Sequence, residues 1–184
     1  LVESLGLTSF RLIAHDYGST VAQEIISRHK EGSLSLSLKS VVLMNSGLFP
    51  EMHRPTTVQK LLMSPIGGLL TGFMGESQLD RSFAKVFGPN TRASKEEIAE
   101  FWSLIAYNRG NRNIHRMLHY VADRKANEKR WVNATKDPKV PVLFINGLED
   151  PVSGSHMADK YRSEVLEPTI VELEGIGHYP QTEA

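Results

Sequence analysis

FRLIAHDYGSTVAQE, residues 10–24, is the stretch that decides the fold. It begins as a short apolar run, passes through a corner of small residues and continues with apolar residues at helical spacing. A buried strand that turns sharply into a helix is the context of a nucleophile elbow, in which the nucleophile stands between two positions that favour small residues. Ala14 and Gly18 occupy those two positions. The pattern therefore predicts that Asp16 lies at the apex of the turn.

A carboxylate at this apex, in place of the usual serine, changes the chemistry that the corner predicts. A serine oxygen attacks an acyl carbon, whereas a carboxylate is suited to a saturated carbon with a leaving group, such as an epoxide or an alkyl halide. The product is an alkyl ester of Asp16, which water must then hydrolyse. Hydrolysis needs a general base, and a His steered by a second carboxylate supplies one. We therefore expect an acid and then a His later in the chain, each at a strand end.

Both expected residues follow strand-like segments. The apolar run VPVLFING, residues 140–147, continues into LEDP, which places Asp150 in the turn after a buried strand. A further strand is predicted over residues 169–173, and glycines in the following EGIGHYP let the backbone turn sharply and carry His178 over the sheet edge. Glu149 is a rival for the role of the acid. Three strand-end signals in this order predict a triad of Asp16, Asp150 and His178.

Several of these residues also have a purely structural explanation. Asp16 by itself is readily a helix N-cap, because a carboxylate commonly stands before a helix. The strand, the corner spacing and both partners together favour the nucleophile. Ser19 is a rival nucleophile, but it falls inside the first helical turn, and His15 is expected to be structural or to lie near the entrance. Three arginines are expected to hold the cap against the core, and binding of an anionic group is the less favoured alternative: Arg54, Arg92 and Arg130.

These motifs resemble the α/β-hydrolase superfamily, in its branch of epoxide hydrolases and haloalkane dehalogenases with a His-Asp-aromatic-Gly elbow. The resemblance covers nearly the whole chain and implies a mostly parallel sheet with flanking helices and an inserted helical cap. It also implies that Asp16 is the nucleophile, Asp150 the acid and His178 the base. Within this branch, mesoderm-specific transcript-like hydrolases share the further motifs FPEMHRP (49–55), VFGPNTR (86–92), RWV (130–132) and HYPQ (178–181).

The resemblance also implies what surrounds the nucleophile. Dehalogenases usually have Trp where this chain has Tyr17, whose phenol reaches differently toward a halide, and this weakens the dehalogenase interpretation. The backbone N–H of Tyr17 is expected to face the ester oxygen during hydrolysis. Epoxide opening needs an acid over the leaving oxygen, commonly a tyrosine of the cap. Tyr107 and Tyr120 are the two candidates, and each is equally well explained as a packed amphipathic aromatic.

We expect residues 1–47 and 134–184 to form the hydrolase core and residues 48–133 to form the helical cap. The chain lacks an initiator Met, begins in the helix-like segment 1–7 and has no strand before the elbow. We therefore expect a fragment without the N-terminal strands and without the loop that supplies half of the oxyanion hole. Such a fragment should be inactive and poorly stable alone. A membrane anchor or signal ahead of residue 1 stays open.

The remaining element predictions rest on periodicity and caps. A capping box of Ser94 and Glu97 predicts a helix with an apolar face that carries Ile98 and Phe101. Residues 113–131 are expected to form one longer helix. The other predicted elements are strands over 9–15 and 40–45, a loop over 33–38, and helices over 18–29, 56–63 and 153–164.

The composition bears on the class of function. The 184 residues carry 21 basic and 21 acidic side chains, and a formal net charge of +0 predicts no nucleic-acid partner. The absence of Cys removes disulfides, thiolate nucleophiles and Cys-based zinc sites, and we expect no metal and no other cofactor. No apolar run reaches the roughly 18 residues that span a bilayer.

These observations lead to one main functional hypothesis. We expect an epoxide-hydrolase-like enzyme that acts on a small apolar substrate, with no membrane segment in this chain and a cytoplasmic location. The alternatives are a haloalkane dehalogenase and a non-enzymatic binding module that retains the fold, because a fold by itself does not give the reaction. The oligomeric state stays open.

Overall fold

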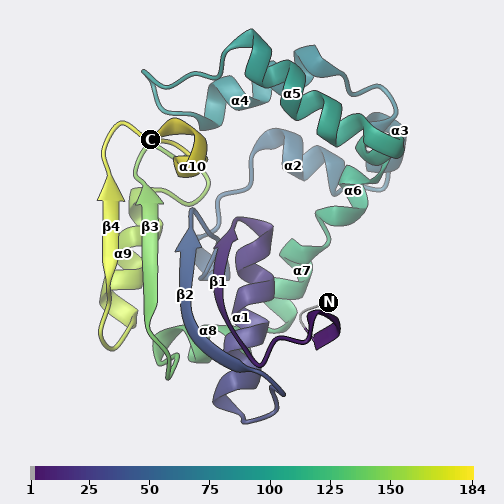
Figure 1. The fold of residues 1–184 in the computed structure, drawn as a ribbon. Helices are drawn as coiled ribbons and strands as arrows, with labels where there is room; N and C mark the ends of the chain where they lie inside the picture. The colour runs from purple at the N-terminus through teal and green to yellow at the C-terminus, as the bar shows by residue number, and fades with distance from the viewer. Residues whose placement is uncertain (1–2) are drawn as a thin grey trace.

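Four strands form one parallel sheet in the order β1-β2-β3-β4 (Figure 1). The computed structural model describes residues 3–184. Because the strands are parallel, their carboxyl ends meet at one edge of the sheet, and side chains that follow them gather there. The strands are β1 Ser9–His15, β2 Ser37–Met44, β3 Val142–Gly147 and β4 Ile170–Leu173.

Three helices cover one face of this sheet: α1 Tyr17–Lys30, α8 Glu128–Lys136 and α9 Ser155–Glu164. Strand side chains alternate between the two faces, so every second residue enters the core that these helices close. Ile13 points to the other face and is 71% exposed. The core side chains with 0% exposure are Ala22, Ile26, Leu43, Phe49, Phe144, Met157 and Ala158.

A second group of helices lies beyond the carboxyl ends of the strands (Figure 1). Aromatic side chains of α4 and α5 form a separate apolar cluster there, joined by Tyr179 from the loop after β4. The elements between β2 and α8 are η2 Pro50–Met52, α2 Thr57–Leu62, α3 Gly67–Thr71, α4 Glu76–Val86, α5 Lys95–Ala106, η3 Tyr107–Asn113, α6 Ile114–Met117 and α7 Tyr120–Ala126. The short η1 Glu3–Leu5 precedes the sheet and α10 Pro180–Glu183 follows it.

Most element predictions are confirmed. The strand over 9–15 coincides with β1, and the helix over 153–164 contains α9. Ser94 caps α5 in a complete capping box with Glu97, and Ile98 and Phe101 lie in the aromatic cluster. Strand β2 begins at Ser37, inside the predicted loop, because its backbone pairs with β1 from Ser9 onward. Of the helix-like segment 1–7, residues 1–2 lie outside the described residues, and a single 3₁₀ turn follows.

The single helix predicted over 113–131 is wrong. The chain forms α6, α7 and the start of α8 instead, with one break at residues 118–119 and another at Asn127. The side chain of Asn127 donates to the carbonyl of Asp123, which also accepts from the backbone N–H of Asn127. The break at Asn127 allows Tyr120 to face the sheet edge, while Trp131 turns toward α1 and donates to Glu24. The face of α7 that carries Tyr120 and the face of α8 that carries Trp131 therefore both contact the core. One straight helix could not place both side chains in this way.

The division into a core (1–47 and 134–184) and a cap (48–133) stays a prediction. One observation bears on its second boundary: α8, which spans residue 133, packs along α1 against the sheet. Within residues 3–184, no helix is both long and apolar enough to cross a bilayer.

Candidate active site

Asp16 stands at the sharp corner between β1 and α1. Its backbone has φ 44° and ψ −109°, a conformation that residues with a side chain rarely adopt, and such strain concentrates at functional sites. Asp16 occupies the N-cap position, but among the described residues its side chain makes no capping hydrogen bond. A helix-capping role therefore does not explain this carboxylate. Its oxygen instead faces His178, which lies near the C-terminal end of the chain.

His178 lies between two carboxylates. Its Nδ1 donates to Oδ2 of Asp150 at 2.7 Å, and its Nε2 lies 3.6 Å from Oδ2 of Asp16. Figure 1 shows why the three residues can meet, since the segments that carry them follow the carboxyl ends of β1, β3 and β4 at one edge of the sheet. In this arrangement the imidazole can hold a proton on Nδ1 while Nε2 faces the elbow.

Asp150 is fixed more firmly than Asp16. Its Oδ1 accepts from the backbone N–H of Val152, and its Oδ2 accepts from the hydroxyl of Ser153 and from the amide of Asn45. The residue is 3% exposed. This set of donors is satisfied by an ionised carboxylate, which suits Asp150 to orient an imidazole.

His178 changes the pKa values of Asp16 and Asp150, and both carboxylates change the pKa of His178. Burial disfavours the imidazolium, but hydrogen bonding and charge from Asp150 and Asp16 outweigh it and raise the pKa of His178 to about 10. Burial also opposes ionisation of the acids, yet His178 lowers the pKa of Asp150 to about 2, with help from Ser153. The same balance, with Arg124 as a second cation, holds the pKa of Asp16 well below its ordinary value.

The structure distinguishes the two candidate tyrosines. The hydroxyl of Tyr120 donates to Oδ1 of Asp16 at 3.1 Å, and the residue is 5% exposed. Tyr107 is 80% exposed and does not reach the site. Tyr17 packs its ring against Tyr120, with centroids 4.9 Å apart. As the first residue of α1, Tyr17 has a backbone N–H without an intrahelical partner, and its oxyanion role stays a prediction.

Arg124 is a site residue that the sequence analysis missed. It is 2% exposed, its Nε donates to the hydroxyl of Thr20, and its Nη2 donates to the backbone carbonyl of Asp16. The guanidinium also stacks over the ring of Tyr120 at 4.6 Å. Spacing could have found it, because residues four apart share one helix face and Tyr120 was already a candidate.

Glu183 is a second missed residue, and it braces the loop that carries His178. Its Oε2 accepts from the backbone N–H groups of Gly88 and Gly177 and from the hydroxyl of Thr91, and its Oε1 accepts from the N–H of Tyr179. One carboxylate thus ties the His loop to the segment between α4 and α5. No motif in the sequence indicates this role for a glutamate five positions after His178.

The rival residues make other contacts. The hydroxyl of Ser19 accepts from Ser46 at 2.5 Å, and Glu149 is exposed while its neighbour reaches His178. His15 donates from Nε2 to the backbone carbonyl of His178 at 2.8 Å, which is the structural role expected for it. Arg130 pairs with Glu24 and Glu31 and so locks α8 to α1.

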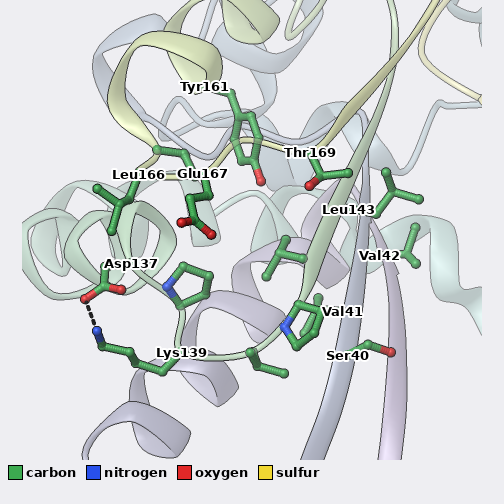
Figure 2. Close-up of a pocket in the computed structure, with 15 residues that line it drawn as sticks. Ser40, Val41, Val42, Asp137, Lys139, Leu143, Tyr161, Leu166, Glu167 and Thr169 are labelled. Atoms are coloured by element: carbon green, nitrogen blue, oxygen red, sulfur yellow. Dashed lines mark ion pairs between the residues drawn. The ribbon is translucent and has the colours of Figure 1, made fainter.

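A cavity of about 720 Å³ lies at the opposite end of the sheet and contains none of these residues (Figure 2). It is lined by the middle of β2, by the start of β3, by residues 137–141, and by α9 and the segment that follows it. The ion pair between Asp137 and Lys139 lies at its edge, and Tyr161 points into it. Because functional groups of parallel sheets gather beyond the carboxyl ends, size alone does not make this cavity the site.

Comparisons with known proteins bear on the fold of the chain. No model of a protein family matches the chain. Solved structures give the class: the chain has the α/β-hydrolase fold, with a TM-score of 0.77 to an α/β-hydrolase fold protein from Burkholderia ambifaria, at 12% identity and over 100% of this chain and 64% of that one. A loop variant of the haloalkane dehalogenase DbeA from Bradyrhizobium elkanii gives 0.76 at 15% identity, and the epoxide hydrolase CorEH gives 0.71 at 17%. Both comparisons cover 99% of this chain and 65% of the other.

Particular relatives are found at higher sequence identity. The chain is 42% identical over 193 residues to the mesoderm-specific transcript homolog protein of Bos taurus, which covers 100% of this chain and 57% of the relative. It is 34% identical over 173 residues to the putative hydrolase LipZ of Mycobacterium tuberculosis, over 94% of this chain and 60% of that protein. The chain therefore spans a little over half the length of the curated relatives that it matches. The resemblance drawn from the elbow and the middle motifs is confirmed.

Proposed function

We propose that this protein is a hydrolase that opens a small epoxide through an alkyl ester on Asp16. The observation that carries the proposal is the placement of His178 between Asp16 and Asp150, 3.6 Å and 2.7 Å away. Support comes from the side chain of Asp16, which turns toward the imidazole and Tyr120 instead of capping its helix. The coarser assignment to hydrolases rests on the fold and on the relatives described above.

The first step uses Asp16 and Tyr120. A carboxylate oxygen of Asp16 attacks a ring carbon of the epoxide, the carbon–oxygen ring bond breaks, and the phenol of Tyr120 gives its proton to the departing alkoxide. Burial, followed by the negative charge of Asp16, raises the pKa of Tyr120. Because ester formation removes that charge, Tyr120 becomes a stronger acid as the alkoxide develops.

The second step uses His178 and Asp150. The Nε2 atom of neutral His178 accepts a proton from water. The resulting hydroxide adds to the carbonyl carbon of the ester on Asp16. The bond from the ester carbon to the alkyl group's oxygen then breaks, the departing alkoxide takes the proton from His178, and a diol leaves. The carboxylic acid formed on Asp16 returns its proton to the phenolate of Tyr120, which lies within hydrogen-bond distance. Loss of the Asp16 charge on ester formation also removes one cause of the raised pKa of His178, so the imidazole loses its proton more readily when a base is needed. Asp150 keeps the ring oriented throughout.

An oxygen-18 experiment tests the ester directly. A single turnover of excess enzyme, expressed from its complete reading frame, is run in H₂¹⁸O with an epoxide. Hydrolysis at the ester carbon places the label in the carboxylate of Asp16, and mass spectrometry of the peptide then shows a gain of one ¹⁸O. Label found only in the diol contradicts an ester on Asp16.

The contact between Tyr120 and Asp16 favours epoxide opening over dehalogenation as the proposed reaction. A halide has no need of a proton, whereas Tyr120 already points its hydroxyl at the nucleophile. Halide release from a panel of bromoalkanes, without epoxide turnover, would reverse this preference. A non-enzymatic binding module would leave Asp16 unlabelled with every substrate.

A further inference from the structure

Buried polar atoms without a partner gather beside the proposed nucleophile. Within residues 3–184, no hydrogen bond is formed by Nη1 of Arg124 or by either ring nitrogen of His53. Arg124 is 2% exposed, and its other two nitrogens already donate to Thr20 and Asp16. Leaving a buried charged donor unpaired costs folding free energy. We therefore expect a bound ligand to accept a hydrogen bond from Nη1 of Arg124.

The guanidinium and the imidazole approach the same point. A Cβ placed on Gly47 would lie 2.2 Å from Nη1 of Arg124 and 3.3 Å from Nδ1 of His53. A side chain at position 47 would therefore displace Arg124. Glycine here allows a residue from the loop after β2 and a residue from α7 to converge.

A cavity of about 380 Å³ opens beside this pair, in the size range of small-ligand sites. Its lining includes both His53 and Arg124, and Pro50, Pro55 and Val121 form an apolar wall. A cavity with an apolar wall and a buried pair of polar groups suits a short hydrocarbon body with one polar end.

The remaining charges around the cavity do not neutralise Arg124. Glu51 is exposed and pairs with Lys160 at 3.3 Å. Lys125 is also exposed and Glu128 is half-buried, and these opposite charges lie at the same lining. Charges in contact with water are screened more strongly than the buried guanidinium.

The donors of the pair define what they can bind. Burial, followed by the positive charge of Arg124, lowers the pKa of His53 to about 4, so its ring is neutral at pH 7 and offers one N–H. Arg124 offers the N–H groups of Nη1. A group that only accepts hydrogen bonds complements these donors, and a carboxylate does so with opposite charge.

The proposed chemistry gives a second reason for a carboxylate. Nη2 of Arg124 lies 4.0 Å from Oδ1 of Asp16. When Asp16 becomes an ester, the buried guanidinium loses this negative charge. A carboxylate on the substrate would restore it, and the stabilisation would be greatest after the ester has formed.

We propose that Arg124 and His53 form a subsite for a carboxylate, and that the substrate is a short epoxy acid whose ring carbon meets Asp16. This inference rests on the proposed function and narrows the small apolar substrate expected from the sequence to one with an anionic end. The two nitrogens Nη1 and Nη2 share one carbon, and Nη2 lies 4.0 Å from Oδ1 of Asp16, so the subsite and the nucleophile flank one guanidinium.

Two matched substrates test the subsite in the protein expressed from its complete reading frame. 2,3-Epoxybutanoate and its carboxamide have the same shape but differ in charge. We expect kcat/KM to be at least about tenfold higher for the acid, and we expect His53→Gln and Gly47→Ala to reduce this ratio. The exposed Lys129→Gln serves as the control and should keep the wild-type ratio. Equal kcat/KM for acid and amide would overturn the subsite.

A second measurement separates this inference from the proposed function. If both substrates label Asp16 in a His178→Gln variant at equal rates, the ester chemistry stands and the carboxylate subsite is wrong. If neither labels Asp16, the proposed function fails and the subsite is decided by calorimetric binding of unreactive butanoate. At least about tenfold weaker binding by His53→Gln would support the subsite, and unchanged binding would overturn it.

Discussion

The hydroxyl of Tyr120 donates to Oδ1 of Asp16 at 3.1 Å, across 104 residues of sequence. The contact joins α7 to the elbow, and Arg124 on the next helical turn reinforces it by donating to the backbone carbonyl of Asp16. The proposed proton donor and the proposed nucleophile are thereby held on the same side of the site before any substrate binds. Such pre-organisation is what an epoxide requires, because attack and protonation occur at adjacent atoms.

Replacing Tyr120 with Phe should slow ester formation by about 10²- to 10³-fold, because the alkoxide loses its proton donor. The ring packing against Tyr17 is kept, so the thermal midpoint should change little. Stopped-flow measurement of the first turnover would check this. Tyr107→Phe is the matched control, since that residue is 80% exposed, and it should retain the wild-type rate. Equal effects of the two substitutions would contradict the assignment of Tyr120.

Replacing His178 with Gln should stop the reaction after the ester has formed. Glutamine cannot take the proton from water, so the adduct on Asp16 accumulates instead of turning over. Intact-protein mass spectrometry should show a gain of one substrate mass that is absent in the double variant Asp16→Ala, His178→Gln. Steady turnover by the single variant would show that another residue supplies the base.

Stability should depend on pH through His178. Folding raises the pKa of His178 from 6.5 to about 10, so its contribution to stability is complete below about pH 6.5 and is lost as the pH rises through 10. The difference in unfolding free energy between wild type and His178→Gln should therefore shrink from pH 6 to pH 10 in urea titrations. Asp150 acts in the opposite sense, because its pKa falls from 3.8 to about 2 and its contribution is lost on acidification. A difference that grows with pH would refute the charged imidazole.

The pKa of His178 should also differ between the free enzyme and the ester. Asp16 contributes both contact and charge to the raised value, and the ester removes its charge. We expect NMR titration of the free protein to give a higher pKa than the pH profile of ester hydrolysis. Equal values would mean that Asp150 alone sets the pKa of His178.

Replacing Glu183 with Gln should loosen the loop that carries His178. The carboxylate accepts four hydrogen bonds, and an amide nitrogen can accept none of them, so at least one donor is left unpaired at a cost of about 1–3 kcal/mol. Ester hydrolysis should slow more than ester formation, because the base is displaced and the nucleophile is not. Glu174→Gln, an exposed acid of the same loop, is the control and should resemble wild type in urea unfolding and in both rates. A larger effect on ester formation would contradict a role through His178.

Local sequence patterns gave much of this site. The elbow, the strand-end turns and the capping box at Ser94 depend on residues within a few positions of one another, so their signals survive without knowledge of the tertiary fold. The prediction of one helix over 113–131 was wrong because it also used only local spacing. Its apolar spacing is continuous, but the break at Asn127 is favoured by packing on both sides, with Tyr120 facing the elbow and Trp131 facing α1.

The sequence by itself determined that a carboxylate stands at a strand-to-helix corner and that an acid and a His follow later strands. Only the tertiary structure decided which tyrosine faces Asp16, that Arg124 lies beneath it, and that Glu183 holds the His loop. These choices depend on contacts between residues about a hundred positions apart, such as Arg124 with Thr20 and Glu183 with Gly88. Periodicity records which side of a helix is apolar, but the path of the chain decides what that side meets.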